Sequence, residues 1–184
     1  MALSATIDTD LTELVISSCS LSKSLKVIST CSDRPNLFLD VKHVQNQDNI
    51  QCLQWIVTAL KAGKDAPKIV IFCRSVNLAG LVYSMLVKSL KKHFVDLNPK
   101  DLIGIYHSET LEKNKSKVLQ SLTSTGIMRV VVATSSLGCG VNMKNVQYVV
   151  HFGPAFHVVD YCQQIGRAGR DGDQLCRAIL YNFP

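Results

Sequence analysis

Residues 161–172 read Tyr-Cys-Gln-Gln-Ile-Gly-Arg-Ala-Gly-Arg-Asp-Gly, and this stretch is the most informative part of the chain. Arg167 and Arg170 are three residues apart, a spacing that on a helical turn would place both guanidinium groups on one side. The small residues around them would let another surface approach the backbone closely. A guanidinium is a planar, permanently charged fork that suits phosphate oxygens. The stretch therefore predicts a segment that recognises phosphate, although a glycine-rich loop with two solvated arginines has the same composition.

The rest of the chain alternates between short apolar runs and amphipathic repeats, which predicts an α/β domain with a parallel sheet and helices on its faces. The apolar runs, typical of buried parallel strands, are residues 68–73, 102–106, 129–133, 147–152 and 177–181. The amphipathic repeats predict helices over residues 50–60, 78–90, 111–122 and 158–165. A short helix is expected at 9–16 and a strand at 25–28, followed by a linker at 33–36.

Six segments, in order along the chain, resemble the motifs of superfamily-2 helicases and most of all those of the RecQ-type DNA helicases. Gln163 to Arg170 matches motif VI, written Q-x-x-G-R-x-G-R, and the Arg-Asp-Gly ending resembles the RecQ variant. The others are residues 1–6 (motif III), 34–36 (Arg-Pro-Asn), 69–75 (motif IV), 106–107 (Tyr-His) and 131–142 (motif V), and the run 146–152 also fits.

This resemblance implies that residues 35–184 form a RecA-like domain, the second motor half of an ATP-dependent 3′–5′ DNA helicase that acts in DNA unwinding, repair and recombination. Residues 1–34 would be a remnant of the first motor domain. The sequence contains no G-x-x-x-x-G-K-[ST] phosphate loop and no Asp-Glu box, which the family carries in its first domain. We therefore expect ATP and Mg²⁺ to be held mainly by a first motor domain, and the lone chain to be inactive.

The resemblance also implies roles for individual residues. Arg170 would be the arginine finger, with Arg167 beside it at the γ-phosphate and Gln163 coupling the two halves. Contacts with ATP, or coupling to it, would come from Gly138, Gly140, Asn142, Ser4 and Thr6. Contacts with the single-stranded track of DNA would come from Arg74, Ser75, Tyr106, His107, Thr134 and Ser135. Because ligands of open α/β sheets gather where the strands end, we expect all these motifs at that edge.

Several residues depart from the family pattern. Val76 stands where relatives often have an arginine, so Arg74 would have to supply that contact. Ser108 and Glu109 follow the Tyr-His pair where relatives carry a small residue and glycine, and the negative charge of Glu109 would weaken a grip on phosphates.

Bulk properties fit this interpretation without selecting it. The 184 residues carry a net charge of +6, which is compatible with nucleic-acid binding. The seven cysteines include no C-x-x-C pair, so no zinc site is predicted. No apolar run reaches the roughly 20 residues that span a bilayer, and we expect an intracellular, nuclear protein. Two alternatives stay open, namely a non-catalytic nucleic-acid-binding or regulatory fragment and half of an RNA helicase.

Overall fold

The computed structural model describes residues 9–21, 25–28, 34–46, 50–92, 98–123, 126–137, 143–170 and 174–184. Contacts divide the chain into two compact units, residues 1–35 and 36–184. The first unit contains α1 (Thr9–Ser18), where a short helix was expected. The prediction of a strand at residues 25–28 is wrong, because Leu25, Val27 and Ile28 are exposed and no described strand pairs with them.

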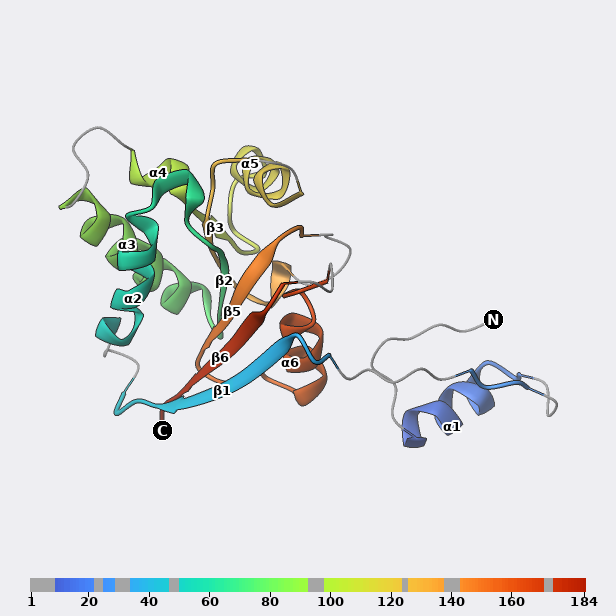
Figure 1. The fold of residues 1–184 in the computed structure, drawn as a ribbon. Helices are drawn as coiled ribbons and strands as arrows, with labels where there is room; N and C mark the ends of the chain where they lie inside the picture. The colour runs from blue at the N-terminus through green and yellow to red at the C-terminus, as the bar shows by residue number, and fades with distance from the viewer. Residues whose placement is uncertain are drawn as a thin grey trace. The chain divides into compact units, whose positions relative to one another are not determined.

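The second unit is built on a sheet of six parallel strands in the order β1-β6-β5-β2-β4-β3 (Figure 1). The strands are β1 (Leu37–His43), β2 (Lys68–Cys73), β3 (Ile103–Tyr106), β4 (Val130–Ala133), β5 (Val146–Phe152) and β6 (Cys176–Asn182). All but β1 were predicted to within one residue at each end. The strand β1 lies at the edge of the sheet, where Phe38, Leu39 and Val41 are exposed, so it lacks the continuous buried apolar pattern of the other strands.

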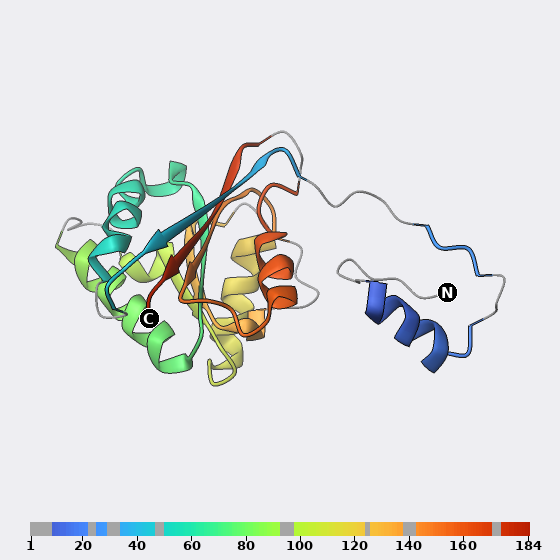
Figure 2. The same ribbon diagram turned by 90° about the horizontal axis from the view of Figure 1, so that it is seen from below.

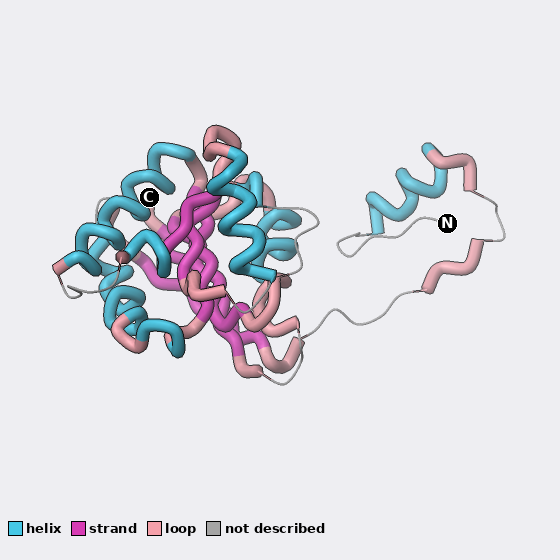
Figure 3. The backbone as a smooth tube through the Cα atoms, turned by 90° about the horizontal axis from the view of Figure 1, so that it is seen from above, coloured by secondary structure: helices cyan, strands magenta, loops and turns pink. Residues whose placement is uncertain are grey.

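Helices cover both faces of this sheet, as predicted (Figures 2 and 3). In β2, Ile69 and Ile71 point into one core with α2 and α3, whereas Val70 and Phe72 point into the other core with α5 and α6. This alternation follows from the twofold side-chain period of a strand. The helices are α2 (Gln54–Leu60), which follows a 3₁₀ turn at Ile50–Leu53, α3 (Val76–Lys91), α4 (Pro99–Leu102), α5 (Glu112–Thr123) and α6 (Val158–Ile165).

Because all six strands are parallel, the sheet has two distinct edges. We call the end of the sheet where the strands begin the amino edge, and the end where they finish the carboxyl edge. Both differ from the lateral edge strands β1 and β3. The helix α6 follows β5 and precedes β6, so the chain leaves the carboxyl edge before α6 and is back at the amino edge at Cys176. The residues predicted to contact ATP in the stretch after α6 and those predicted to contact nucleic acid lie at different ends of the strands, as the next subsection describes.

Candidate functional site

The two arginines of the opening stretch lie in a turn that follows α6. The helix ends at Ile165, and residues 166–170 form successive turns in which Gly169 has φ of +58°. Arg167 is only 6% exposed, whereas Arg170 is exposed and its Nε donates a hydrogen bond to the Gly166 carbonyl at 3.3 Å. The helix α6, on which a shared side for the two guanidinium groups was predicted, therefore ends before both arginines.

Asn36 fixes this turn from a distance of 133 positions in sequence. Its Nδ2 donates to the carbonyls of Gly169 at 2.8 Å and Gln174 at 3.2 Å. The N–H of Gly169 donates to the carbonyl of Val146, the first residue of β5, at 3.1 Å. The asparagine of the Arg-Pro-Asn segment and the double-arginine segment thus form one structure.

These contacts also show which edge of the sheet holds the arginine turn. Asn36 precedes β1, Val146 begins β5, and Cys176, whose N–H donates to the Asn36 carbonyl at 2.8 Å, begins β6. The turn therefore lies at the amino edge. The expectation that all motifs gather at the carboxyl edge is wrong for this one, because α6 carries the chain back across the face of the sheet.

We call the hydrogen bonds that Asn36 and Val146 make to Gly169 the clamp. Gly169→Ala is expected to destabilise the domain by about 2 kcal/mol, because a residue with a side chain resists a positive φ and the new methyl group would collide with Asn36 of the clamp. A Cβ at this position would lie 2.6 Å from Asn36 Nδ2 and 3.0 Å from Cys176 Sγ. Urea unfolding measures the loss. Gly80→Ala is the matched control, since a Cβ there meets nothing within 4 Å and lies inside α3. Equal effects of the two substitutions would contradict the role of the clamp.

The candidates for nucleic-acid contact follow three neighbouring strands at the carboxyl edge. Arg74 and Ser75 follow β2, His107 follows β3, and Thr134 and Ser135 follow β4. The structure therefore brings this predicted group together, and Tyr106 joins it as the partly buried last residue of β3.

The members of this group differ in what their side chains can still bind. Ser75 is the N-cap of α3, and its Oγ accepts from the N–H of Leu78 at 3.2 Å. Thr134 is nearly buried, and its hydroxyl lies 2.9 Å from that of Ser136. Arg74 and Ser135 are exposed, so they are the members best placed to meet a ligand.

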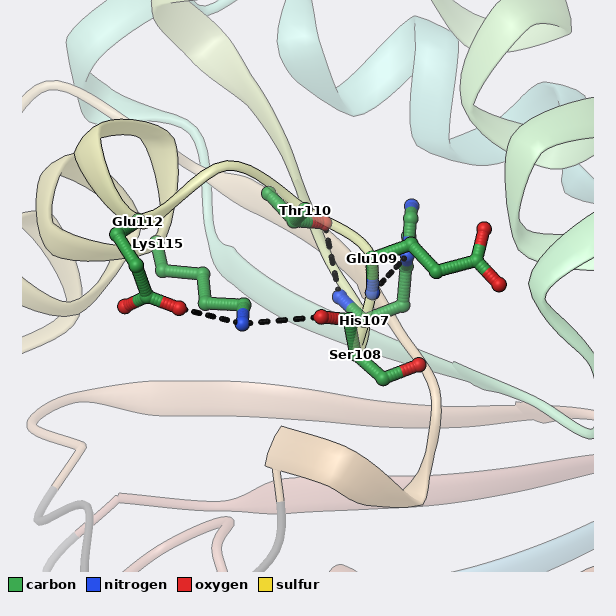
Figure 4. A network of polar contacts seen from close by, with 6 residues as sticks. All are labelled: His107, Ser108, Glu109, Thr110, Glu112 and Lys115. Atoms are coloured by element: carbon green, nitrogen blue, oxygen red, sulfur yellow. Dashed lines mark hydrogen bonds and ion pairs between the residues drawn. The ribbon is translucent and has the colours of Figure 1, made fainter.

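His107 is held in a tight turn by its own neighbours (Figure 4). Its Nδ1 accepts from the N–H of Glu109 at 3.2 Å, and its own N–H donates to Thr110 Oγ1 at 3.1 Å. Lys115 from α5 braces the turn, since its Nζ donates to the Ser108 carbonyl at 3.1 Å. With Nδ1 acting as an acceptor, a neutral imidazole carries its proton on Nε2, which makes that atom a hydrogen-bond donor.

Lys115 also contacts a carboxylate, Glu112 Oε1, at 2.7 Å. Sequence reasoning placed Lys115 only within the helix predicted over residues 111–122. Its link to the turn after β3 depends on the three-dimensional packing of α5.

A buried pair that sequence reasoning missed joins β5 to α6. His151 is 1% exposed, and its Nε2 lies 2.7 Å from Gln164 Oε1. The imidazole also stacks on Phe72 and contacts the ring of Tyr161, with centroids 5.5 and 4.8 Å away. Burial lowers the pKa of His151 to about 4, more strongly than the bond to Gln164 raises it. The histidine is therefore neutral near pH 7 and donates Nε2–H to the amide oxygen.

Five predicted residues lie outside the described residues, namely Ser4, Thr6, Gly138, Gly140 and Asn142. Within the described ranges, no group of three or more His, Cys, Asp or Glu side chains could hold a metal ion. Burial raises the pKa of the Cys73 thiol to about 12, so this cysteine at the end of β2 stays protonated.

Comparison with known proteins places these features in a family. Residues 48–172 match the model of the helicase conserved C-terminal domain. The chain is 31% identical over 163 residues to a protein of Acanthamoeba polyphaga mimivirus that is named as an ATP-dependent RNA helicase, covering 88% of this chain and 26% of that one. It is 30% identical to the ATP-dependent DNA helicase RecQ of Haemophilus influenzae, covering 100% of this chain and 27% of RecQ. The chain thus spans about a quarter of the length of these relatives.

The fold has close counterparts among solved structures. Domain 2 of the DEAD-box helicase Mss116p bound to an RNA duplex superposes with a TM-score of 0.64 at 20% identity, covering 80% of this chain and 54% of that one. The six-stranded parallel sheet with helices on both faces is therefore the RecA-like architecture of a second helicase motor domain.

Proposed function

Because the chain belongs to the helicase conserved C-terminal domain family, we propose that it forms the second motor half of an ATP-dependent 3′–5′ DNA helicase of the RecQ type. In this proposal Arg170 is the arginine finger, Arg167 lies beside it at the γ-phosphate, and Gln163 couples the motor halves. The similarity to RecQ over the whole chain supports a DNA substrate.

The observation that carries the proposal is the exposed Arg170 on a clamped turn. Asn36 and Val146 hold the backbone of Gly169, the residue before Arg170. A group that stabilises charge in phosphoryl transfer acts by position, so a guanidinium on a rigid turn suits a γ-phosphate held by another domain.

The arrangement of the two edges supports a motor with separate sites for ATP and nucleic acid. The arginine turn lies at the amino edge, and Arg74, His107 and Ser135 lie at the carboxyl edge of the same sheet. A ligand-driven movement of one motor half against the other would therefore carry the nucleic-acid contacts with it.

ATP and Mg²⁺ would be held mainly by a first RecA-like domain in this proposal. The described residues fit the nucleotide in one respect, since the exposed Arg170 offers guanidinium donors for phosphate oxygens. Arg167 is buried in this structure, so its part in the proposal requires its side chain to become accessible. Bound Mg²⁺ would supply charge neutralisation at the β- and γ-phosphates. Residues 1–34 would be the end of that first domain, and residues 35–184 the second.

A nuclear location and roles in DNA repair and recombination, which the resemblance to RecQ-type helicases implied, belong to the same proposal. None of the helices in the described part of the chain has both the length and the apolar character needed to cross a membrane.

A specific observation favours a second candidate, half of an RNA helicase. The mimivirus relative is named as an RNA helicase, and the second domain of Mss116p is bound to RNA. Competition between DNA and RNA oligonucleotides of equal sequence and length distinguishes the two. Preference for DNA supports the RecQ-type proposal, and preference for RNA overturns its substrate.

The chain alone is expected to bind single-stranded DNA in a salt-dependent way without turning over ATP. Fluorescence anisotropy at several salt concentrations measures the binding, and phosphate release measures hydrolysis. Arg74→Gln should lower the slope of log affinity against log salt by about 0.7, because one phosphate contact is lost. Salt-independent binding, or ATP turnover by the chain alone, would contradict the proposed division of labour.

A further inference from the structure

Phe156 is an exposed aromatic residue at the carboxyl edge of the sheet. It lies in the loop between β5 and α6 and is 56% exposed. Arg74, which follows the neighbouring strand β2, places its guanidinium carbon 4.7 Å from the centre of the Phe156 ring. The arginine covers part of the ring, and more than half of the residue's surface remains open to solvent.

Phe156 and Arg74 line a shallow cleft together with Ser135, which follows β4. The strand β2 lies between β5 and β4, so this cleft spans three adjacent strand ends. The centre of a water molecule can move through only about 20 Å³ inside it, so the cleft is confined and gives a nucleotide base little room. A base at this place would therefore lie on the rim of the cleft, against Phe156.

We propose that Phe156 is a stacking platform for one unpaired base of a single-stranded nucleic acid, and that Arg74, lying over the same ring, holds a phosphate next to that base. This inference rests on the proposed function, since it assumes that the carboxyl edge faces nucleic acid. It adds a base contact to the phosphate contact that Arg74 makes in the proposed function.

The chemistry of the pair favours nucleic acid over an apolar protein partner. An apolar surface laid on Phe156 would take the neighbouring guanidinium out of water without offering its N–H groups acceptors, which is costly. A nucleotide offers a π-face to the ring and phosphate oxygens to the arginine, so both are satisfied together. Asp160 also lines the cleft, and its carboxylate opposes deep entry of a phosphate, which again favours binding at the rim.

Anisotropy with a fluorescein-labelled oligothymidylate tests the inference on the full chain. Phe156→Ala should weaken binding about 5- to 150-fold, the range seen when one base–aromatic stack is lost. Phe156→Trp should restore it. The salt slope should not change, because no phosphate contact is removed. Phe38→Ala is the matched control, since Phe38 is 53% exposed but lies near the start of the edge strand β1, at the amino edge. Thermal unfolding confirms that each variant is folded.

An oligonucleotide of abasic sites completes the test. It should bind the wild-type chain and Phe156→Ala equally, because no base remains to stack. If Phe156→Ala binds oligothymidylate as tightly as the wild type while Arg74→Gln lowers the salt slope, the stacking inference is wrong and the proposed function stands. If Phe156→Ala loses affinity equally for both oligonucleotides, Phe156 only positions Arg74 and the platform is likewise ruled out. If the wild-type chain shows no salt-dependent binding, the proposed function and this inference both fail.

Discussion

Arg170→Ala is expected to lower the ATP hydrolysis rate by about 10³- to 10⁵-fold in a motor that joins this chain to a first RecA-like domain with a phosphate loop and an Asp-Glu box. The guanidinium of an arginine finger stabilises the charge that develops on the transferring phosphoryl group, and alanine leaves that charge without a partner. The turn that holds Arg170 is fixed by Asn36 and Val146, so truncating the exposed side chain should leave the fold intact.

A phosphate-release assay at saturating ATP and single-stranded DNA measures this effect. The control is Arg177→Ala, because Arg177 is also an exposed arginine but lies on β6. We expect the control to retain the wild-type rate. An Arg170→Ala motor that hydrolyses ATP within tenfold of the wild type would remove Arg170 from the catalytic role.

The pH dependence of stability is expected to depend on His151. Its pKa falls from 6.5 in the unfolded chain to about 4 in the folded one because burial disfavours the imidazolium. Between these values the unfolded state binds more protons than the folded state, so stability decreases as pH falls. Above pH 6.5 the neutral His151 makes its full contribution to the unfolding free energy. By pH 4 about 3 kcal/mol of that free energy should be lost.

Urea unfolding of the wild type and of His151→Gln at a series of pH values isolates this contribution. The variant should be less stable at pH 7, since it loses the contacts of the imidazole with the rings of Phe72 and Tyr161. Its unfolding free energy should change less with pH between pH 6.5 and 4. His43→Gln is the control, because His43 is exposed on the edge strand β1 and its replacement should keep the wild-type slope. Parallel profiles for the wild type and His151→Gln would mean that His151 does not stay neutral in the fold.

Most of the fold could be predicted from local patterns, because five of the strands are largely buried and read as apolar runs. The strand β2, for example, is buried at all six positions. The strand β1 could not be predicted in this way, since its apolar residues are exposed at the edge of the sheet. Residues 25–28 show the opposite error, because they were predicted to form a strand and do not. An apolar run forms a strand only where the backbone of another strand is available for hydrogen bonds.

The candidate site could be predicted as residues but not as an arrangement. Motif spacing selected Asn36, Arg167 and Arg170, yet the bond from Asn36 to Gly169 depends on β1 lying beside β6. The position of the arginine turn at the amino edge depends on how α6 crosses the sheet. The pair of His151 and Gln164 was missed because neither residue carries a motif role, and only packing brings them to 2.7 Å.

The central claim is that this chain completes a nucleotide site held by another domain. Its most direct test is DNA-stimulated ATP hydrolysis by a first RecA-like domain alone, by this chain alone, and by the two joined. The account predicts turnover only in the joined motor, and loss of that turnover in the joined motor with Arg170→Ala. Hydrolysis by this chain alone, or a joined motor as active with Arg170→Ala as without it, would contradict the account.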